Sequence, residues 1–459
     1  MIQFFQTYKN LLLQSSVSIS LTALIIFLKI PIFFLHGLHT YIHPENLSNG
    51  VRAAIRRPNE SSDSKPNAGL RKRNKSKDKF EFDESNAQIF RLKLDEAHLQ
   101  SRLYFDEYRN AFTISFVAIS SLLLRIYLNN ESENSGFFVD GIFVPVLLGF
   151  LGVFRILILL GKVSLEKSAS RRSEKQLSIF FGFLGVVLGG LTCYTFASSV
   201  FDFDFDFVSV DGSGRFSIAV LMGCLAGLMF IPATKIARSF WLGTDQLRSN
   251  LSMITCGWFA RSILYANYLV ITLTALLWIK PLSEMLVNKN IDNGIGSHLV
   301  NEVGTADRLL GNVGFSVSDF RKVRIWCLLL SAVLQLVTLR PNLQMYLNEA
   351  LLSWYQRLHA SKEPDLEFSR AKVFLHNHYL CLVVVQFLAP PLLLLLFLGF
   401  SQVDGDYFKT DFQFLFSLMP CSAFVRELAL FIAWWVVFVT AVYTSATLVL
   451  FRRGDLYVS

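Results

Sequence analysis

The chain has 459 residues, of which 53% are hydrophobic and only 17% are charged. A soluble domain carries about 25% charged residues, so this composition excludes an ordinary soluble globular protein. The 43 phenylalanines are hard to bury in a soluble core and easy to place against lipid, and the net charge is +8. We therefore expect an integral multi-pass membrane protein of the plasma membrane or endomembrane system, with the lipid bilayer as a partner.

The apolar residues form long blocks, and a run of about 18 or more apolar residues predicts a membrane-spanning helix. Helices satisfy the backbone polar groups of such segments in hydrocarbon. The fold class is therefore all-α, a polytopic helical bundle of about nine transmembrane helices, within a range of eight to ten. The predicted spans are Leu11–Leu38, Asn110–Leu128, Gly141–Gly161, Leu177–Val200, Phe216–Ala233, Ser262–Lys280, Lys322–Leu339, Tyr379–Phe400 and Leu428–Phe451.

Residues 1–38 contain the first block, which is longer than the apolar region of a signal peptide and is followed by no small-residue cleavage site. We expect it to be retained as the first transmembrane helix. Lys29 lies inside this block and is followed by Pro31, which can loosen a helix.

Residues 39–109 form a basic linker whose middle, 56–86, is rich in Ser, Asn and Lys. This composition cannot bury enough apolar surface to fold, so we expect disorder there, followed by an amphipathic helix over Leu92–Tyr108. Two interpretations of the basic run are open: a solvated linker, or a segment attracted to anionic lipid headgroups. Its cations are Arg71, Lys72, Arg73, Lys75, Lys77 and Lys79.

Residues 110–459 hold the remaining spans, and charges inside them are costly enough to mark candidate functional sites. Arg155 is the deepest, about 9 Å from the end of its span at 1.5 Å per residue. Arg155 and Lys29 could bind an anion or a lipid phosphate, or they could reach the membrane surface or pair with carbonyls. No Asp or Glu lies squarely within a predicted span, which argues against a proton-coupled transporter.

The stretch "VFDFDFDFV" (Val200–Val208) alternates aspartate with phenylalanine. In an extended chain, residues two apart share one face, so the carboxylates and the rings point to opposite sides. A calcium loop of the EF-hand type would need a glycine at its sixth position and a glutamate at its twelfth, and both are missing. We expect an interfacial anchor with its rings in lipid and its carboxylates in water.

Two further segments, 234–261 and 341–377, repeat apolar residues every three or four positions and predict amphipathic surface helices. The paired G-x-x-x-G patterns of Gly185/Gly189 and Gly223/Gly227 predict a close crossing of the fourth and fifth spans.

The basic residues of the loops alternate along the nine predicted spans. One set of segments holds 30 lysines and arginines and the other holds seven. Because positive residues mark the cytoplasmic side, we expect the N-terminus outside and the C-terminus in the cytoplasm. The basic linker and the amphipathic helices then face the cytoplasm, and the aspartate-rich stretch faces the opposite side.

Catalytic and ligand-binding motifs are missing: the chain has no P-loop, G-x-S-x-G, H-E-x-x-H or G-x-G-x-x-G. Its six cysteines are scattered, so they indicate neither a zinc site nor a disulfide framework. His376 and His378 are two residues apart, on different faces of a helix. We therefore expect no enzyme, no cofactor, no metal and no nucleic-acid partner.

Several short segments resemble the transmembrane protein 161 A/B family of eukaryotic multi-pass membrane proteins. The segments that carry the resemblance are "FDEYRNAF" (Phe105–Phe112), "LLWIKP" (Leu276–Pro281), "LRPNLQMYLN" (Leu339–Asn348), "QFLAPPLLLL" (Gln386–Leu395) and the pair Trp434–Trp435. The resemblance implies no catalytic residues and an association with cation currents. Within it, Arg340, Gln344 and Asn348 recur at spacing four and form a polar stripe that could cap helices or contact a partner.

Three hypotheses of function follow. The first is a non-enzymatic regulator or accessory subunit of ion flux, or a membrane scaffold, with ion channels or other membrane proteins as partners. The second is a channel or transporter for an ion, an anionic solute or a lipid that uses Arg155 and Lys29. The third is a membrane-embedded lipid-modifying enzyme that uses His376 or His378.

Overall fold

A computed structural model describes most of the chain. The described residues are 8–42, 89–128, 141–166, 172–196, 200–203, 212–244, 256–287, 316–360, 367–403 and 423–456. The predicted disordered segment 56–86, with all six candidate headgroup cations, lies outside them.

The described residues form an all-α bundle with 8 helices long and apolar enough to cross a membrane, or up to 9 when a bent pair is counted as one span. This confirms the predicted polytopic bundle; the side on which each terminus lies stays a prediction. The helices are α2 (Lys9–Phe27), α5 (Phe105–Leu128), α6 (Phe143–Leu165), α7 (Arg172–Leu191) with its π-helical extension η4 (Thr192–Phe196), α9 (Gly212–Thr244), α10 (Trp258–Leu276), α16 (Leu380–Ser401) and α18 (Ala423–Arg453). The bent pair is α13 (Val317–Val337) with α14 (Leu339–Ala360), at 42°.

The first helix is shorter than predicted. It ends at Phe27, because Lys29 adopts a left-handed conformation (φ 52°) and a second, short helix, α3 (Ile30–Leu35), starts there with Pro31 in its first turn. The sequence signal for this break is Pro31, which cannot continue the preceding helix but suits the first turn of a new one.

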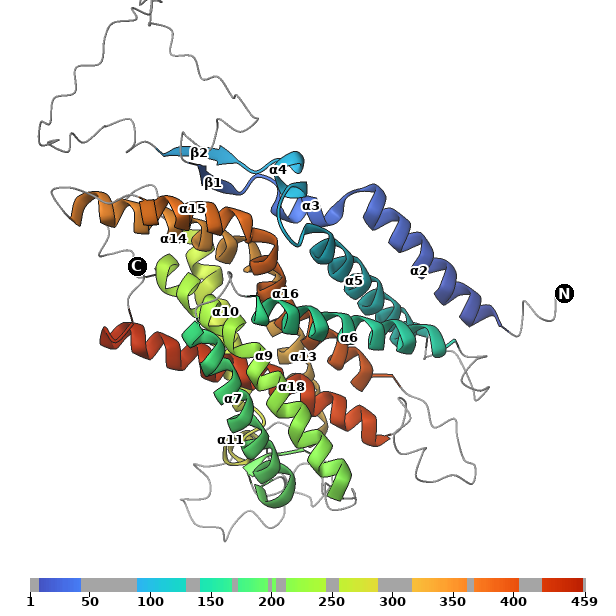
Figure 1. The fold of residues 1–459 in the computed structure, drawn as a ribbon. Coiled ribbons are helices and arrows are strands. Elements are labelled where there is room, and N and C mark those ends of the chain that lie inside the picture. Colours follow the sequence, from blue (N-terminus) through green and yellow to red (C-terminus); the bar gives the residue numbers. More distant parts are fainter. Residues whose placement is uncertain are drawn as a thin grey trace, which may run out of the picture.

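The two ends of the linker pair as a small antiparallel sheet. Strand β1 (His39–Ile42) pairs with β2 (Phe90–Lys93), with His39 opposite Lys93. The predicted helix over Leu92–Tyr108 is accordingly divided into the end of β2, the short helix α4 (Glu96–Gln100) and the start of α5, with a turn at Tyr104 (φ 66°). We call the end of the bundle that carries β1, β2, α14 and α15 (Glu367–His378) the sheet end (Figure 1).

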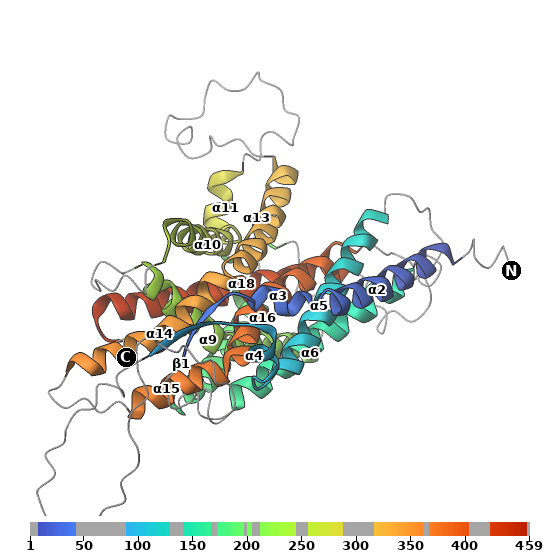
Figure 2. The same cartoon turned by 90° about the horizontal axis from the view of Figure 1, so that it is seen from above.

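Helix α16 forms the centre of the bundle. Every residue from Leu380 to Phe400 except Leu395 is buried. Helices α2, α5 and α6 lie on one side of α16 and α10, α11 (Lys280–Leu286) and α13 on the other (Figure 2). The adjacent prolines Pro390 and Pro391 are accommodated inside this helix, as is common for helices that cross membranes.

Helices α7 and α9 pack closely, as the glycine patterns predict. A Cβ on Gly223 would lie 2.7 Å from the backbone nitrogen of Val186, and one on Gly185 would lie 2.7 Å from Cβ of Ala226. The Ser178 hydroxyl also donates a hydrogen bond to the carbonyl oxygen of Gly227 at 2.7 Å. Only glycine permits this approach of the two backbones.

Helix α9 is longer than its predicted span. It continues past Pro232 to Thr244, so residues 234–244 extend a membrane helix, and α10 begins at Trp258. The second amphipathic segment, 341–377, becomes α14 and α15. We call the opposite end of the bundle, where α11 lies with residues 200–203, the α11 end.

Candidate functional site

The extension of α9 places a lysine next to the central helix. The Lys235 ammonium donates a hydrogen bond to Oε1 of Gln386 in α16 at 2.6 Å, and it lies 5.9 Å from the ring centre of Tyr346 in α14. Gln386 is fully buried, and its position in an otherwise apolar helix is explained by this contact. A polar residue inside a membrane bundle faces a partner of this kind because lipid offers none.

One turn further along α9, Arg238 joins two carboxylates. Its Nη2 lies 3.6 Å from Oε1 of Glu174 in α7, and its Nη1 lies 3.5 Å from Oε1 of Glu349 in α14. Glu349 is also 3.6 Å from Nζ of Lys372 in α15, and it is only 5% exposed. Four helices thus meet in one group of charges. We name Glu174, Lys235, Arg238, Glu349 and Lys372 the sheet-end network.

A neutral histidine adjoins the sheet-end network. The His376 ring stacks on Tyr346 with 4.5 Å between ring centres, and its Nδ1 lies 2.9 Å from the carbonyl oxygen of Lys372. Burial lowers the pKa of His376 to about 4, although the nearby carboxylate of Glu349 opposes this shift. The ring is therefore uncharged at neutral pH. His378 stacks on Phe374 instead, so the two histidines do not meet in one site.

A second polar cluster lies at the α11 end. Nη2 of Arg324 in α13 lies 2.6 Å from Oδ2 of Asp202, and its Nε donates to the carbonyl oxygen of Leu277 at 3.1 Å. The Ser283 hydroxyl of α11 donates to the same carboxylate at 2.8 Å. Burial raises the pKa of Asp202, but the hydrogen bonds from Arg324 and Ser283 outweigh it and bring the pKa below its usual range. We name Asp202, Ser283 and Arg324 the α11-end cluster.

The described part of the aspartate-rich stretch alternates as predicted, but its rings face protein. Phe201 lies 4.9 Å from Trp434, and Phe203 lies 5.1 Å from Phe431, each between ring centres. The rings leave the lipid interface because the buried aromatic side chains of α18 offer them a packed site. Asp204 and Asp206 lie outside the described residues.

The candidate cations Arg155 and Lys29 do not form one site. Lys29 pairs with Glu96 of α4 at 2.6 Å and is largely exposed at the break between α2 and α3. Arg155 lies in α6, and its buried Nε has no hydrogen-bond partner among the described residues.

The predicted polar stripe of α14 contacts β1 and the residues before it. Nη2 of Arg340 donates to the carbonyl oxygen of His36 at 3.1 Å. Gln344 both accepts a hydrogen bond from the His39 amide at 2.9 Å and donates one to the His39 carbonyl at 3.1 Å. Asn348 accepts from Gln344 at 2.9 Å and from the hydroxyl of Tyr41 at 3.2 Å. Within the described chain, the stripe therefore binds an internal segment.

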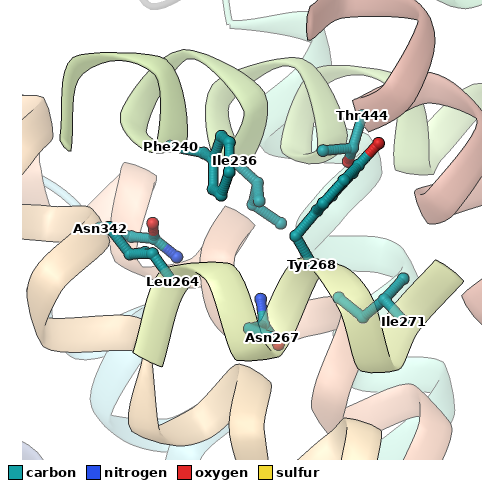
Figure 3. Close-up of a pocket in the computed structure, with 8 residues that line it drawn as sticks. All are labelled: Ile236, Phe240, Leu264, Asn267, Tyr268, Ile271, Asn342 and Thr444. Carbon is teal, nitrogen blue, oxygen red and sulfur yellow. The ribbon is translucent and has the colours of Figure 1, made fainter. Parts of the chain in front are cut away.

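Figure 3 shows a small cavity between α9, α10, α14 and α18, and it is lined by three buried polar side chains, Asn267, Asn342 and Thr444. Oδ1 of each asparagine and Oγ1 of Thr444 have no hydrogen-bond partner among the described residues. The volume, about 10 Å³, is that of a single water position. This cavity is suited to hydration of the bundle and is too small for an organic ligand.

Within the described ranges, no three His, Cys, Asp or Glu side chains lie close enough together to hold a metal ion.

Both polar clusters include residues of a segment that resembles a known family. Residues 208–408, which include α9 through α16, match the family described as Predicted transmembrane protein 161AB. This match supports membership of the transmembrane protein 161 A/B family. The family segment contains Lys235, Arg238, Glu349, Lys372, Ser283 and Arg324. No solved structure matches the chain.

The sequence alone did not predict the sheet-end network. The predicted span ends at Ala233, and the sequence places Lys235 and Arg238 in the predicted surface helix 234–261. The continuing apolar spacing through Ile236 and Phe240 was a usable signal that α9 goes on. Glu174 and Glu349 gave no such signal, because their burial depends on helices that are distant in sequence.

Proposed function

We propose that this member of the transmembrane protein 161 A/B family is a non-enzymatic regulator of ion flux that acts on partner membrane proteins as an accessory subunit. The observation that carries the proposal is the apolar, buried central helix α16. A protein that conducts ions needs a polar or hydrated route, and the centre of this bundle offers packed hydrocarbon.

The apolar stretch of α16 is long enough to cross most of the hydrocarbon core of a bilayer. After Gln386, the next polar side chain in α16 is Ser401. These 15 positions span about 22 Å at 1.5 Å per residue, which is most of the roughly 30 Å hydrocarbon thickness of a bilayer. An ion crossing here would lose its hydration without replacement ligands, which is prohibitive.

Charged side chains at the two ends of the bundle have partners within the chain, which supports a structural role for them. Lys235 is hydrogen-bonded to Gln386, and Arg324 is paired with Asp202. These contacts join helices that are far apart in the sequence, so they stabilise the bundle in one arrangement. Such clusters are consistent with a fixed scaffold.

Helix α2 provides a surface for a partner. It buries Gln14, Ser18 and Ile25 and leaves large apolar side chains such as Ile19 and Phe27 exposed. Only 17% of the 18-residue apolar stretch of this helix is buried within the chain. A peripheral helix of this kind can contact another membrane protein without disturbing the core.

The experiment is whole-cell recording in cells that express the chain, beside an Arg155→Leu variant matched for surface level. We expect the amplitude of endogenous currents to change, with no new conductance, and we expect the variant to act like the wild type. A new conductance with its own ion selectivity that disappears with Arg155 would contradict the proposal and favour a channel or transporter.

A further inference from the structure

An apolar groove is lined by residues of α7, α9 and α18. Its volume is about 460 Å³, within the roughly 300–1,000 Å³ typical of pockets for organic ligands. Aromatic side chains form much of its wall: Phe181, Phe230, Trp435, Phe438 and Tyr443. The groove is thus far larger than the cavity of Figure 3, and its wall is aromatic where that cavity is lined by three polar side chains.

The groove has the length of an acyl chain. Along α7 its lining residues run from Ser173 to Leu188, a span of about 22 Å at 1.5 Å per residue. Half of the hydrocarbon core of a bilayer is about 15 Å thick. A lipid from one leaflet can therefore lie with its acyl chain along the groove and its headgroup at the polar end.

The polar end of the groove lies at the sheet end of α7, α9 and α18. Ser173, Glu174 and Arg238 line the groove there, together with Phe451 in the last turn of α18 and Leu456 just beyond it. Basic residues adjoin these lining residues in the sequence: Arg172 precedes Ser173, and Arg452 and Arg453 follow Phe451. Arg238 is already paired with Glu174 and Glu349, so the positive charge that this mouth offers a ligand comes from the exposed residues Arg172, Arg452 and Arg453, against the exposed Asp455. The mouth keeps an excess of positive charge.

We propose that this groove binds one anionic glycerophospholipid, with an acyl chain along the aromatic wall and the phosphate at Ser173 and the basic mouth. The charge distribution of the loops predicts that the mouth faces the cytoplasm, the leaflet in which anionic lipids are concentrated. The apolar wall favours an acyl chain, and the basic mouth favours a negatively charged headgroup. This inference goes beyond the proposed function and does not depend on it.

The test uses the full-length protein purified in detergent and mixed with equal amounts of phosphatidylserine and phosphatidylcholine, with retained lipid counted by native mass spectrometry. The headgroup variant is Arg452→Gln with Arg453→Gln. Its matched control is Arg91→Gln with Lys93→Gln in β2, which removes the same charge from exposed residues of the sheet end that do not line the groove. The groove variant is Ala446→Phe, an exposed lining residue, and its control is Val449→Phe, an exposed residue of α18 outside the lining.

We expect the wild type to retain phosphatidylserine in preference to phosphatidylcholine. The headgroup variant should bind phosphatidylserine roughly 30-fold more weakly, the change expected for two basic residues near a membrane surface, and Ala446→Phe should lose the bound lipid. Both controls should behave as the wild type. Equal retention of the two lipids by the wild type would overturn the proposal, as would unchanged retention by Ala446→Phe.

Discussion

At the scale of single residues, Glu349 is a buried carboxylate that two cations share. Its carboxylate is 5% exposed and lies between Arg238 and Lys372. A buried charge is tolerated only when it is paired, and removing one partner leaves the others without compensation. The carboxylate of Glu349 lies 3.5 Å from Nη1 of Arg238 and 3.6 Å from Nζ of Lys372, which is long for an ion pair. Because the group is buried, it still contributes strongly to stability.

Glu349→Gln should lower the free energy of unfolding by about 3 kcal/mol, because two cations then lose their shared carboxylate. The control is Asp319→Asn, which removes a carboxylate that is 60% exposed and pairs with Lys322 at the surface. Exposed pairs contribute little, so the control should leave stability nearly unchanged. Thermal unfolding of both variants in the same detergent measures the difference, and equal stability of the two would contradict the buried role.

His376 makes the folded state sensitive to acid. Its pKa is about 4 in the folded protein, below the value of about 6.5 expected when it is unfolded. Between these values the unfolded chain binds a proton that the folded chain does not, so stability falls as the pH drops from about 6.5 towards 4. Well above pH 6.5 the imidazole is neutral in both states, so the residue adds no pH dependence there.

His376→Phe keeps a ring against Tyr346 and removes the titration. We expect the melting temperature of the wild type to fall more steeply than that of the variant between pH 6.5 and 4.5, with matching slopes above pH 7. Parallel curves over the whole range would show that folding does not lower the pKa of His376.

At the scale of elements, the sequence predicted where membrane helices lie better than where they end. The apolar blocks are local features, and each predicted span corresponds to a helix or a bent pair. The ends depend on tertiary packing: Lys29 breaks the first helix, while α9 continues through Pro232 to Thr244. The sheet-end network was missed for the same reason, since its charges come from α7, α9, α14 and α15.

Adding one methyl group at the α7–α9 crossing tests how closely the two helices approach. Gly223→Ala should cost about 1–3 kcal/mol, because its Cβ would meet the Val186 backbone at 2.7 Å and force the helices apart. Gly190→Ala in α7 is the control: its Cβ would have no neighbour within 4 Å among the described residues, so the change should be neutral or stabilising. Comparable stability of the two variants would mean that the helices do not cross so closely.

The attachment of the small sheet depends on Gln344. Gln344→Met removes both hydrogen bonds to the His39 backbone, so hydrogen exchange of the His39 amide should accelerate roughly tenfold or more. Gln356→Met, at an exposed position of the same helix, should leave that exchange rate as it is in the wild type. Unchanged exchange in Gln344→Met would show that β1 is held by other contacts.

At the scale of the whole molecule, an apolar centre separates two polar ends. The sheet-end network and the α11-end cluster lie at opposite ends of the bundle, and the stretch of α16 between Gln386 and Ser401 has no polar side chain. The sequence predicted the class and the number of spans because both follow from hydropathy. It could not predict that α16, among nine similar blocks, would be the buried one, because that depends on which helices surround it.

The most direct test of this closed centre is ion flux through the purified full-length protein reconstituted into lipid vesicles. Entry of K⁺, Na⁺ and Cl⁻ would be followed with ion-sensitive dyes beside vesicles without protein. A regulator with a packed centre predicts fluxes no greater than those of the protein-free vesicles. A flux that rises with the amount of protein and falls in Arg155→Leu would contradict it and show that the chain itself carries ions.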